Sequence, residues 1–179
     1  ISDRTPFIKS IKYYLMMKKS FLLFLLIFCS FAFCQTYKVI GIKDGDTVSL
    51  LMDGKEQTVR LAHIDCPEKK QPYGTKAKDM ISVLCFGKMV SLKGDGKRDR
   101  NGRLIAELLL PNGINVNKTL VKAGLAWHFK KYSKDEIYAQ LEIEARNKKV
   151  GLWKDKTPVS PWNWRKMKKE EKAINSVAF

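Results

Sequence analysis

The sequence predicts an α+β domain in which five short strands form a small β-barrel and about three helices pack on it. Three observations predict this fold class. Short apolar runs with period-two alternation are separated by glycine-rich turns, which is typical of small barrels. Three longer segments suit helices. A length of 179 residues suits one globular domain.

The first 34 residues are expected to be an upstream segment with a secretory signal peptide. Methionines at 16–17 are followed by two lysines and the apolar run 21–33, which is the pattern of such a signal. The run is short for a membrane span. We therefore predict a secreted or periplasmic protein that meets the membrane only through this segment. An uncleaved anchor is one alternative, and a lipoprotein signal at Cys34 is another, ranked lower because Phe33 is bulky for a lipobox.

Residues 35–153 are expected to hold the domain, and residues 154–179 form a C-terminal tail rich in tryptophan and lysine. The predicted strands cover about 36–43, 46–53, 56–63, 88–94 and 103–110. The predicted helices cover 74–85, 116–123 and 135–149.

The last predicted helix has an apolar stripe. Ile137, Leu141 and Ala145 recur at i, i+4 and i+8, which predicts that they form its core face. In the tail, the tryptophans are expected to anchor the chain to the domain and the remainder to fray.

The stretch from Arg60 to Glu68 concentrates chemistry in nine residues. It begins as a strand with alternating polar and apolar residues, and the alternation then fails at Ala62. This parity switch indicates a bulge or bend near Ala62 or His63. Such a bend lets Arg60 and Asp65 reach one site, although a straight strand would put them on opposite faces. The bland alternative is a surface strand with an ion pair and a turn.

Two further stretches favour a functional site over a plain surface strand. Asp46 follows an Asp-Gly turn and opens a strand, so it can pair with Asp65 as a second oxygen ligand for a cation. Arg103 ends the basic turn 97–103 and can complete a guanidinium clamp with Arg60. Each stretch alone also fits a solvated turn.

Cys66 and Cys85 are the cysteines that remain after the first 34 residues. Export would place them in an oxidising compartment, which favours a disulfide between them. Two buried free thiols are the alternative, and sequence alone cannot check the geometry of a bridge.

The chain is strongly basic, with a net charge of +16. Residues 1–34 hold five of its 34 basic residues and one of its 18 acidic residues, so the rest keeps a net charge of +12. A compact domain this basic attracts polyanions, and nucleic acid is the expected partner. Arg100, Lys130 and Tyr132 lie in basic stretches that suit phosphate contact and base stacking, and a solvated rim is the alternative.

Several separated motifs resemble the staphylococcal (micrococcal) nuclease family in order and spacing. They are residues 44–48, 60–68, 99–103, 117–125 and 151–153. The resemblance covers roughly Tyr37 to Trp153. It implies a five-stranded OB-fold barrel and a thermonuclease-like, calcium-dependent phosphodiesterase that acts on DNA and RNA and leaves 3′-phosphate ends.

The resemblance also assigns roles that the chemistry of the residues supports. Asp46, Asp65 and the backbone carbonyl of Cys66 are the expected Ca²⁺ ligands, a loose oxygen set suited to calcium. Arg60 and Arg103 are expected to stabilise transition-state charge on the phosphate.

Glu68 is expected to orient or deprotonate the attacking water. The rival hypothesis is a non-catalytic OB-fold module that binds nucleic acid. Acids facing a phosphate argue against this rival, because binding needs only basic charge. We expect a monomer with no stable protein partner.

Overall fold

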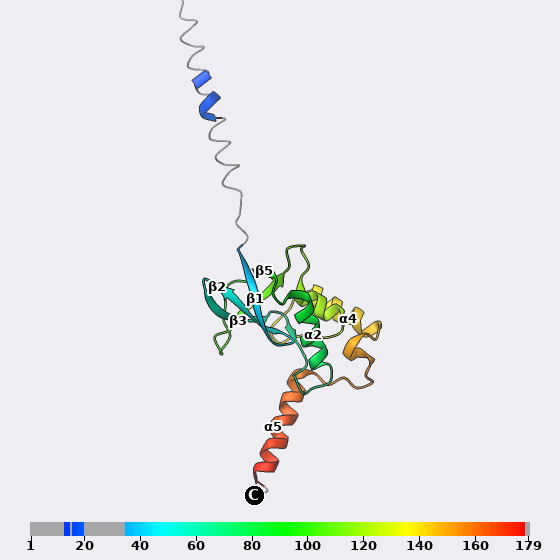
Figure 1. Ribbon diagram of the computed structural model, residues 1–179. Coiled ribbons are helices and arrows are strands. Elements are labelled where there is room, and N and C mark those ends of the chain that lie inside the picture. The colour runs from blue at the N-terminus through cyan, green and yellow to red at the C-terminus, as the bar shows by residue number, and fades with distance from the viewer. Residues whose placement is uncertain (1–12, 15, 20–34, 178–179) are drawn as a thin grey trace, which may run out of the picture. The chain divides into compact units, whose positions relative to one another are not determined.

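The computed structural model of the protein describes residues 13, 14, 16–19 and 35–177 (Figure 1). The chain divides into two compact units, residues 1–34 and 35–179. In the first unit, residues 13, 14 and 16–19 are helical, and the rest of the predicted signal segment lies outside the described residues. Within the described ranges, no helix is long and apolar enough to cross a membrane. The signal peptide stays a prediction.

The second unit is built on a closed five-stranded barrel, as the sequence predicts. Its strands, in the order in which they pair around the barrel, are β1 (Thr36–Asp44), β2 (Thr47–Met52), β3 (Lys55–Leu61), β6 (Leu104–Leu109) and β5 (Met89–Lys93). Neighbouring strands are antiparallel except β3 and β6, which are parallel. The α+β fold with a five-stranded OB-type barrel is therefore confirmed.

Helices cover the barrel and complete its core. They are α2 (Gly74–Cys85), α3 (Val116–Lys122), α4 (Glu136–Asn147) and the 3₁₀ turn η1 (Gly151–Lys154). The barrel interior is filled by inward-facing aliphatic side chains that are almost fully buried, among them Val39, Val48, Leu50, Val59, Leu61, Val90 and Leu108. On α2, Ala77, Ile81 and Cys85 form a buried stripe at intervals of four residues.

The buried face of α4 differs from the predicted one. Tyr138, Glu142 and Ala145 are buried, whereas Ile137 is 54 % exposed. Tyr138 donates a hydrogen bond to Glu107 on β6, and Glu142 is paired with Lys130 and Arg146. Of the predicted core face, Ala145 is buried and Leu141 packs against the core, whereas Ile137 was wrong. The apolar pattern missed Tyr138 and Glu142, because their polar groups have partners inside the fold.

The C-terminal tail also differs from the prediction. The chain after η1 crosses the surface as residues 155–160, called the C-terminal strap below, and then forms α5 (Pro161–Val177). Proline suits the first position of this helix, where its missing N–H has no helical partner to lose. The tail is therefore helical through Val177 rather than frayed, and α5 extends away from the barrel strands (Figure 1).

The predicted disulfide is wrong in this structure, because Cys66 and Cys85 are both buried free thiols. The Cys66 thiol donates to the carbonyl of Gly45 (3.2 Å), and the Cys85 thiol donates to the carbonyl of Ile81 (3.1 Å). A Cβ built on Gly45 would lie 2.7 Å from Ala77 and 2.9 Å from the Cβ of Cys66, so Cys66 packs near Ala77 on α2. Cys85 lies eight residues further along α2, about 12 Å along the helix axis and beyond disulfide reach.

Candidate active site

The predicted bend between Arg60 and Asp65 is present. β3 ends at Leu61, and β4 (Ile64–Asp65) begins after a turn at Ala62 and His63. His63 adopts a left-handed conformation, with φ of 67°. β4 leaves the barrel to pair with β7 (Trp127–His128) in a separate two-stranded sheet. The bend brings the buried carboxylate of Asp65 back to Arg60, whose guanidinium donates to it at 2.8 Å.

Asp46 reaches the same guanidinium from the turn between β1 and β2. Thr47 pairs with Arg60 across the two strands, and the N–H of Leu61 donates to the carbonyl of Asp46 at 2.8 Å. The Asp46 carboxylate accepts hydrogen bonds from the N–H of Cys66 (2.7 Å) and from Arg60 (2.8 Å). Gly45 permits this arrangement, because any side chain there would collide with α2 and Cys66.

The two aspartates therefore share one internal cation. Asp46 is 6 % exposed and Asp65 is 1 % exposed, and Arg60 pairs with both at 2.8 Å. Burial raises the pKa of Asp46 to about 7, although Arg60 pulls the pKa down, and the charges of Asp44 and Asp65 raise it further. This pair holds more negative charge than Arg60 neutralises.

Glu68 follows Pro67 on the loop between β4 and α2. The N–H of Glu68 donates to the side chain of Gln71 at 3.1 Å. Gly74 at the start of α2 packs beneath this loop so closely that an added Cβ would lie 1.9 Å from the carbonyl oxygen of Glu68. Gln71 and Gly74 therefore fix the backbone that carries Glu68, while its side chain stays partly exposed.

Arg165 is a site residue that sequence reasoning missed. It lies in the first turns of α5, and its guanidinium donates to Glu68 at 2.6 Å and to Asp65 at 2.7 Å and 3.4 Å. The contact spans nearly 100 residues of sequence, and no local pattern marks it. The sequence feature that could have pointed to Arg165 is its place as a lone arginine between Trp164 and a lysine-rich run.

Arg103 is placed differently from the predicted clamp. It lies one residue before β6, and its guanidinium is held by Asp99, with Nε and one terminal nitrogen at 2.7 Å and 2.6 Å from the same carboxylate oxygen. The structure records no contact between Arg103 and the acids around Arg60. Arg100, on the same turn, is exposed. The catalytic role of Arg103 and the substrate-binding role of Arg100 stay predictions.

Aromatic and basic residues line the rim beside β7. Tyr132 is 72 % exposed and packs edge-on against Phe129, which stacks on Trp162 of α5 at 5.5 Å. Lys130 pairs with the buried Glu142 at 3.3 Å. The exposed face of Tyr132 suits base stacking, whereas Lys130 also has a structural partner, so both substrate-binding roles stay predictions.

The two histidines have structural partners. His63 Nδ1 and His128 Nε2 each lie 2.9 Å from the hydroxyl of Ser133, and both rings stack on Tyr138. Burial lowers the pKa of His128. Both histidines therefore take part in packing and hydrogen bonding inside the fold.

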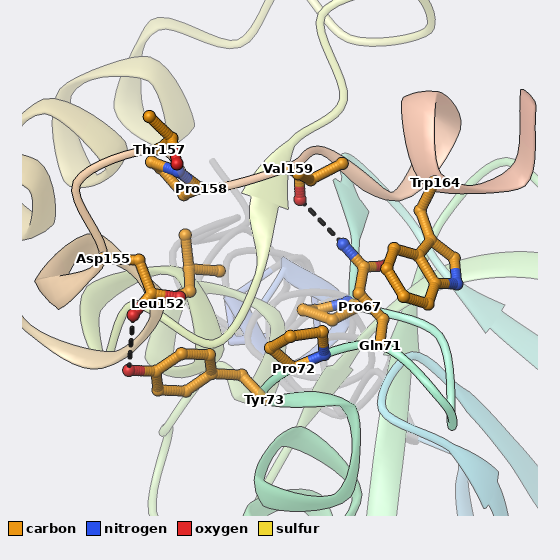
Figure 2. A pocket seen from close by; sticks show the side chains of 10 residues that line it. All are labelled: Pro67, Gln71, Pro72, Tyr73, Leu152, Asp155, Thr157, Pro158, Val159 and Trp164. Atoms are coloured by element: carbon orange, nitrogen blue, oxygen red, sulfur yellow. Dashed lines mark hydrogen bonds between the residues drawn. The ribbon is translucent and has the colours of Figure 1, made fainter. Parts of the chain in front are cut away.

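A small hollow lies between the Glu68 loop and the C-terminal strap. Figure 2 shows Gln71 donating to the carbonyl of Val159 across it, at 2.7 Å, with Pro67 and Trp164 beside them. Asp46, Asp65 and Glu68 are not part of its lining. The hollow therefore borders the acidic site without being that site.

Asp46 and Asp65 are the residues of this site that could hold a hard divalent cation. Asp46 and Asp65 offer carboxylate oxygens, and the backbone of Cys66 lies against Asp46 through its N–H. Across the described ranges 13–14, 16–19 and 35–177, no three His, Cys, Asp or Glu side chains form a complete ligand cluster. A site of two carboxylates and one carbonyl would leave positions for water and a phosphate oxygen, as calcium coordination allows.

Comparison with known proteins identifies the relatives of this chain. The family model described as "Staphylococcal nuclease homologue" matches residues 58–155. An "Uncharacterized endonuclease" of Escherichia coli O157:H7 is 43 % identical over 131 residues, which is 73 % of this chain and 85 % of the relative. An "Uncharacterized endonuclease" of Haemophilus influenzae is 41 % identical over 160 residues, 87 % of this chain and 89 % of that protein. A "Micrococcal nuclease" of Shigella flexneri is 36 % identical over 142 residues, 74 % and 81 % of the two chains.

Proposed function

Because this chain belongs to the staphylococcal nuclease family, we propose that it is an exported, calcium-dependent nuclease that hydrolyses DNA and RNA to products with 3′-phosphate ends. Nuclease activity follows from the family. The proposal adds four properties: dependence on calcium, cleavage of both DNA and RNA, products with 3′-phosphate ends, and export. The single observation that carries the metal is the pair of buried aspartates, Asp46 and Asp65, that share one guanidinium.

The residues of the site divide the work of phosphodiester hydrolysis. Asp46, Asp65 and the carbonyl of Cys66 would hold Ca²⁺, which when bound supplies positive charge to the attacked phosphate. Arg60 offers two planar donors that are already oriented by the aspartates, so its interaction strengthens as charge grows on the phosphate oxygens. Glu68, on a rigid loop beside this group, accepts a proton from the attacking water or orients it.

Substrate attraction comes from the rest of the surface. Residues 35–179 carry a net charge of +12, which steers a polyanion toward the domain with little regard for sequence or sugar. Tyr132 presents an exposed ring on which a base can stack. These contacts favour a nuclease that accepts both DNA and RNA.

The test of the metal is plasmid and RNA degradation by the purified exported protein, in calcium and in chelator. We expect cleavage in Ca²⁺, little cleavage in Mg²⁺, and none in chelator, because a flexible oxygen site suits calcium better than strict octahedral coordination. Asp46→Asn is the matched control, since it removes one ligand charge with little change in size. Equal turnover in Mg²⁺ with calcium rigorously removed would contradict the calcium assignment.

A non-catalytic binder would instead retard DNA in a gel without shortening it. End-group analysis of the products tests the 3′-phosphate assignment. The N-terminal mass of the mature protein tests export, with a start near Gln35 expected after signal cleavage.

A further inference from the structure

Arg165 enters the acidic site from outside the region that the family model matches. That region ends at residue 155, and Arg165 lies ten residues later on α5. Its guanidinium bridges Glu68 and Asp65, at 2.6 Å and 2.7 Å. It is therefore the second guanidinium, after Arg60, in direct contact with the proposed catalytic and metal-binding acids.

The residues around Arg165 fix its position. Trp162 stacks on Phe129 with an interplanar angle of 5° and packs edge-on against Trp127, which pairs with Asp65 in the β4–β7 sheet. These contacts hold the first turn of α5 against the strand that carries Asp65.

A second attachment comes from Gln71. This buried side chain donates to the carbonyl of Val159 (Figure 2) and accepts from the N–H of Glu68. One residue therefore joins the catalytic loop to the C-terminal strap. Both the acids and the helix that carries Arg165 are thus held in place by packed, hydrogen-bonded groups. Preorganisation of this kind is what a charge-stabilising group needs.

The charge balance of the site gives Arg165 a purpose. Asp46, Asp65 and Glu68 place three carboxylates around the position that an anionic phosphodiester must occupy, and Arg60 offsets only one of them. The permanent positive charge of Arg165 reduces the repulsion between these acids and the anionic substrate. Arginine suits the task, because its planar fork that now spans two carboxylates also matches two phosphate oxygens. Its side chain is 44 % exposed, so it lies at the open side of the site.

We propose that Arg165 is a substrate-binding residue of the nuclease site, and that its guanidinium contacts the attacked phosphate together with Arg60. The proposal rests on the proposed function, since it requires a phosphodiester substrate. It assigns α5 to the active site and makes the helix part of the catalytic unit. The opposing hypothesis is that Arg165 blocks the site by occupying its acids.

The test compares Arg165→Gln with Lys166→Gln in the full exported chain. Both variants lose one positive charge at adjacent positions of α5, but Lys166 is 77 % exposed and faces Glu170 at 3.9 Å. With short single-stranded DNA and saturating calcium, Arg165→Gln is expected to lower kcat/KM about 10- to 100-fold, the size of a charge-assisted hydrogen bond. Lys166→Gln is expected to change it by less than about two-fold, as for an exposed charge.

A binding measurement separates phosphate contact from a structural role. Two cleavage-resistant dinucleotides are used, one with an anionic phosphorothioate linkage and one with a neutral methylphosphonate linkage. The wild type and Lys166→Gln should prefer the anionic compound, and Arg165→Gln should lose most of that preference. This readout needs no turnover, so it still decides the role of Arg165 if the wild type proves inactive and the proposed function fails.

Three results would overturn the proposal. Unchanged kcat/KM in Arg165→Gln would show that the residue does not contact the reacting phosphate. A faster reaction, or tighter calcium binding with faster turnover, would show that it blocks the site. An unchanged preference for the anionic dinucleotide would assign it a structural role. If Arg165→Gln does not fold, Arg165→Lys replaces it, because lysine keeps the charge and loses the fork; a several-fold loss is expected, and wild-type kcat/KM contradicts the proposal.

Discussion

Two acidic sites in this protein have opposite surroundings. At the mouth of the barrel, the three acids Asp46, Asp65 and Glu68 meet two guanidinium groups, those of Arg60 and Arg165. On β6, the buried Glu107 alone receives hydrogen bonds from Tyr138 and from Asn115 (2.9 Å), and an ion pair from Lys93 (3.3 Å). The first group has more acids than cations, and the second has more donors than acids.

The difference appears in the protonation equilibria. Burial raises the pKa of Asp46 to about 7, and Arg60 only partly offsets this. Burial would also raise the pKa of Glu107, but its hydrogen bonds from Tyr138, Asn115 and Lys93 outweigh burial and hold the pKa below its usual value. Glu107 ties the barrel to α3 and α4, so it stabilises the fold. At the barrel mouth the three acids outnumber their two cations, and a buried acid with a raised pKa in such a cluster is a candidate functional group.

The largest effect should follow from removing the shared cation. Arg60→Gln is expected to reduce turnover about 10²–10³-fold, because Arg60 is positioned to meet charge that develops on the phosphate. DNA affinity should change little, since 29 basic residues remain outside the first 34 positions in the wild type and share the ground-state attraction. Steady-state kinetics and a separate binding measurement check this, with Lys55→Gln as a control for an exposed charge at the start of β3.

Arg103→Gln belongs beside that test. A loss of the same size would show that Arg103 leaves Asp99 to meet the phosphate. If Arg60→Gln instead loses DNA affinity in proportion to turnover, Arg60 contributes to binding rather than to catalysis. The difference between the barrel mouth and Glu107 would then not reflect catalysis.

The next effect concerns Glu68. Glu68→Gln keeps the size of the side chain and removes the proton acceptor, so turnover is expected to fall about 10²-fold. DNA binding should be equal or tighter, because one negative charge near the phosphate is gone. The losses from Arg60→Gln and Glu68→Gln should not add in the double variant, since both groups act on one transition state. Near-normal turnover of Glu68→Gln would place the proton acceptor elsewhere.

The smallest effect on activity should come from replacing Glu107, the acid that stabilises the fold. Glu107→Gln is expected to lower the free energy of unfolding by about 1–2 kcal/mol at neutral pH and to leave the turnover of folded protein unchanged. Because the folded pKa of Glu107 is lowered, its stabilisation is present above the unfolded pKa and is lost as pH falls through the folded pKa. The difference from the wild type should therefore shrink in acid. Denaturant unfolding from pH 7 to pH 3 measures it, and a difference that grows in acid would contradict the assignment.

Sequence patterns predicted the parts of this protein that depend on local rules. The five strands and α2–α4 follow period-two and helical patterns, and their observed bounds lie within about two residues of the predicted ones. The bend at His63 follows from a parity change and appears as a left-handed residue. The structure brings Arg60, Asp46 and Asp65 together as the sequence predicted, because the bend and the turn before β2 place these short motifs side by side. Their roles in the reaction stay predictions.

The missed features depend on contacts between distant parts of the chain. Arg165 reaches Glu68 across 97 positions of sequence, and its anchor is the packing of Trp162 on Phe129. The buried face of α4 was predicted only in part, because the polar groups of Tyr138 and Glu142 find partners only in the folded protein. The disulfide was expected from export and cysteine count, whereas α2 holds Cys85 well away from Cys66.

The unbalanced charge at Asp46 is the central claim, and the pH dependence of unfolding in the absence and presence of calcium tests it most directly. In chelator, the raised pKa of Asp46 means that its contribution to stability is full below the unfolded pKa and is lost as pH rises toward about 7.

Asp46→Asn should therefore gain stability relative to the wild type between pH 5 and pH 8, whereas Glu107→Gln should not. Calcium at pH 8 should then stabilise the wild type and Glu107→Gln, but not Asp46→Asn, because only a folded site with both aspartates binds the ion. The account is contradicted if Asp46→Asn, like Glu107→Gln, becomes less stable relative to the wild type as pH rises. It is also contradicted if calcium stabilises all three proteins equally.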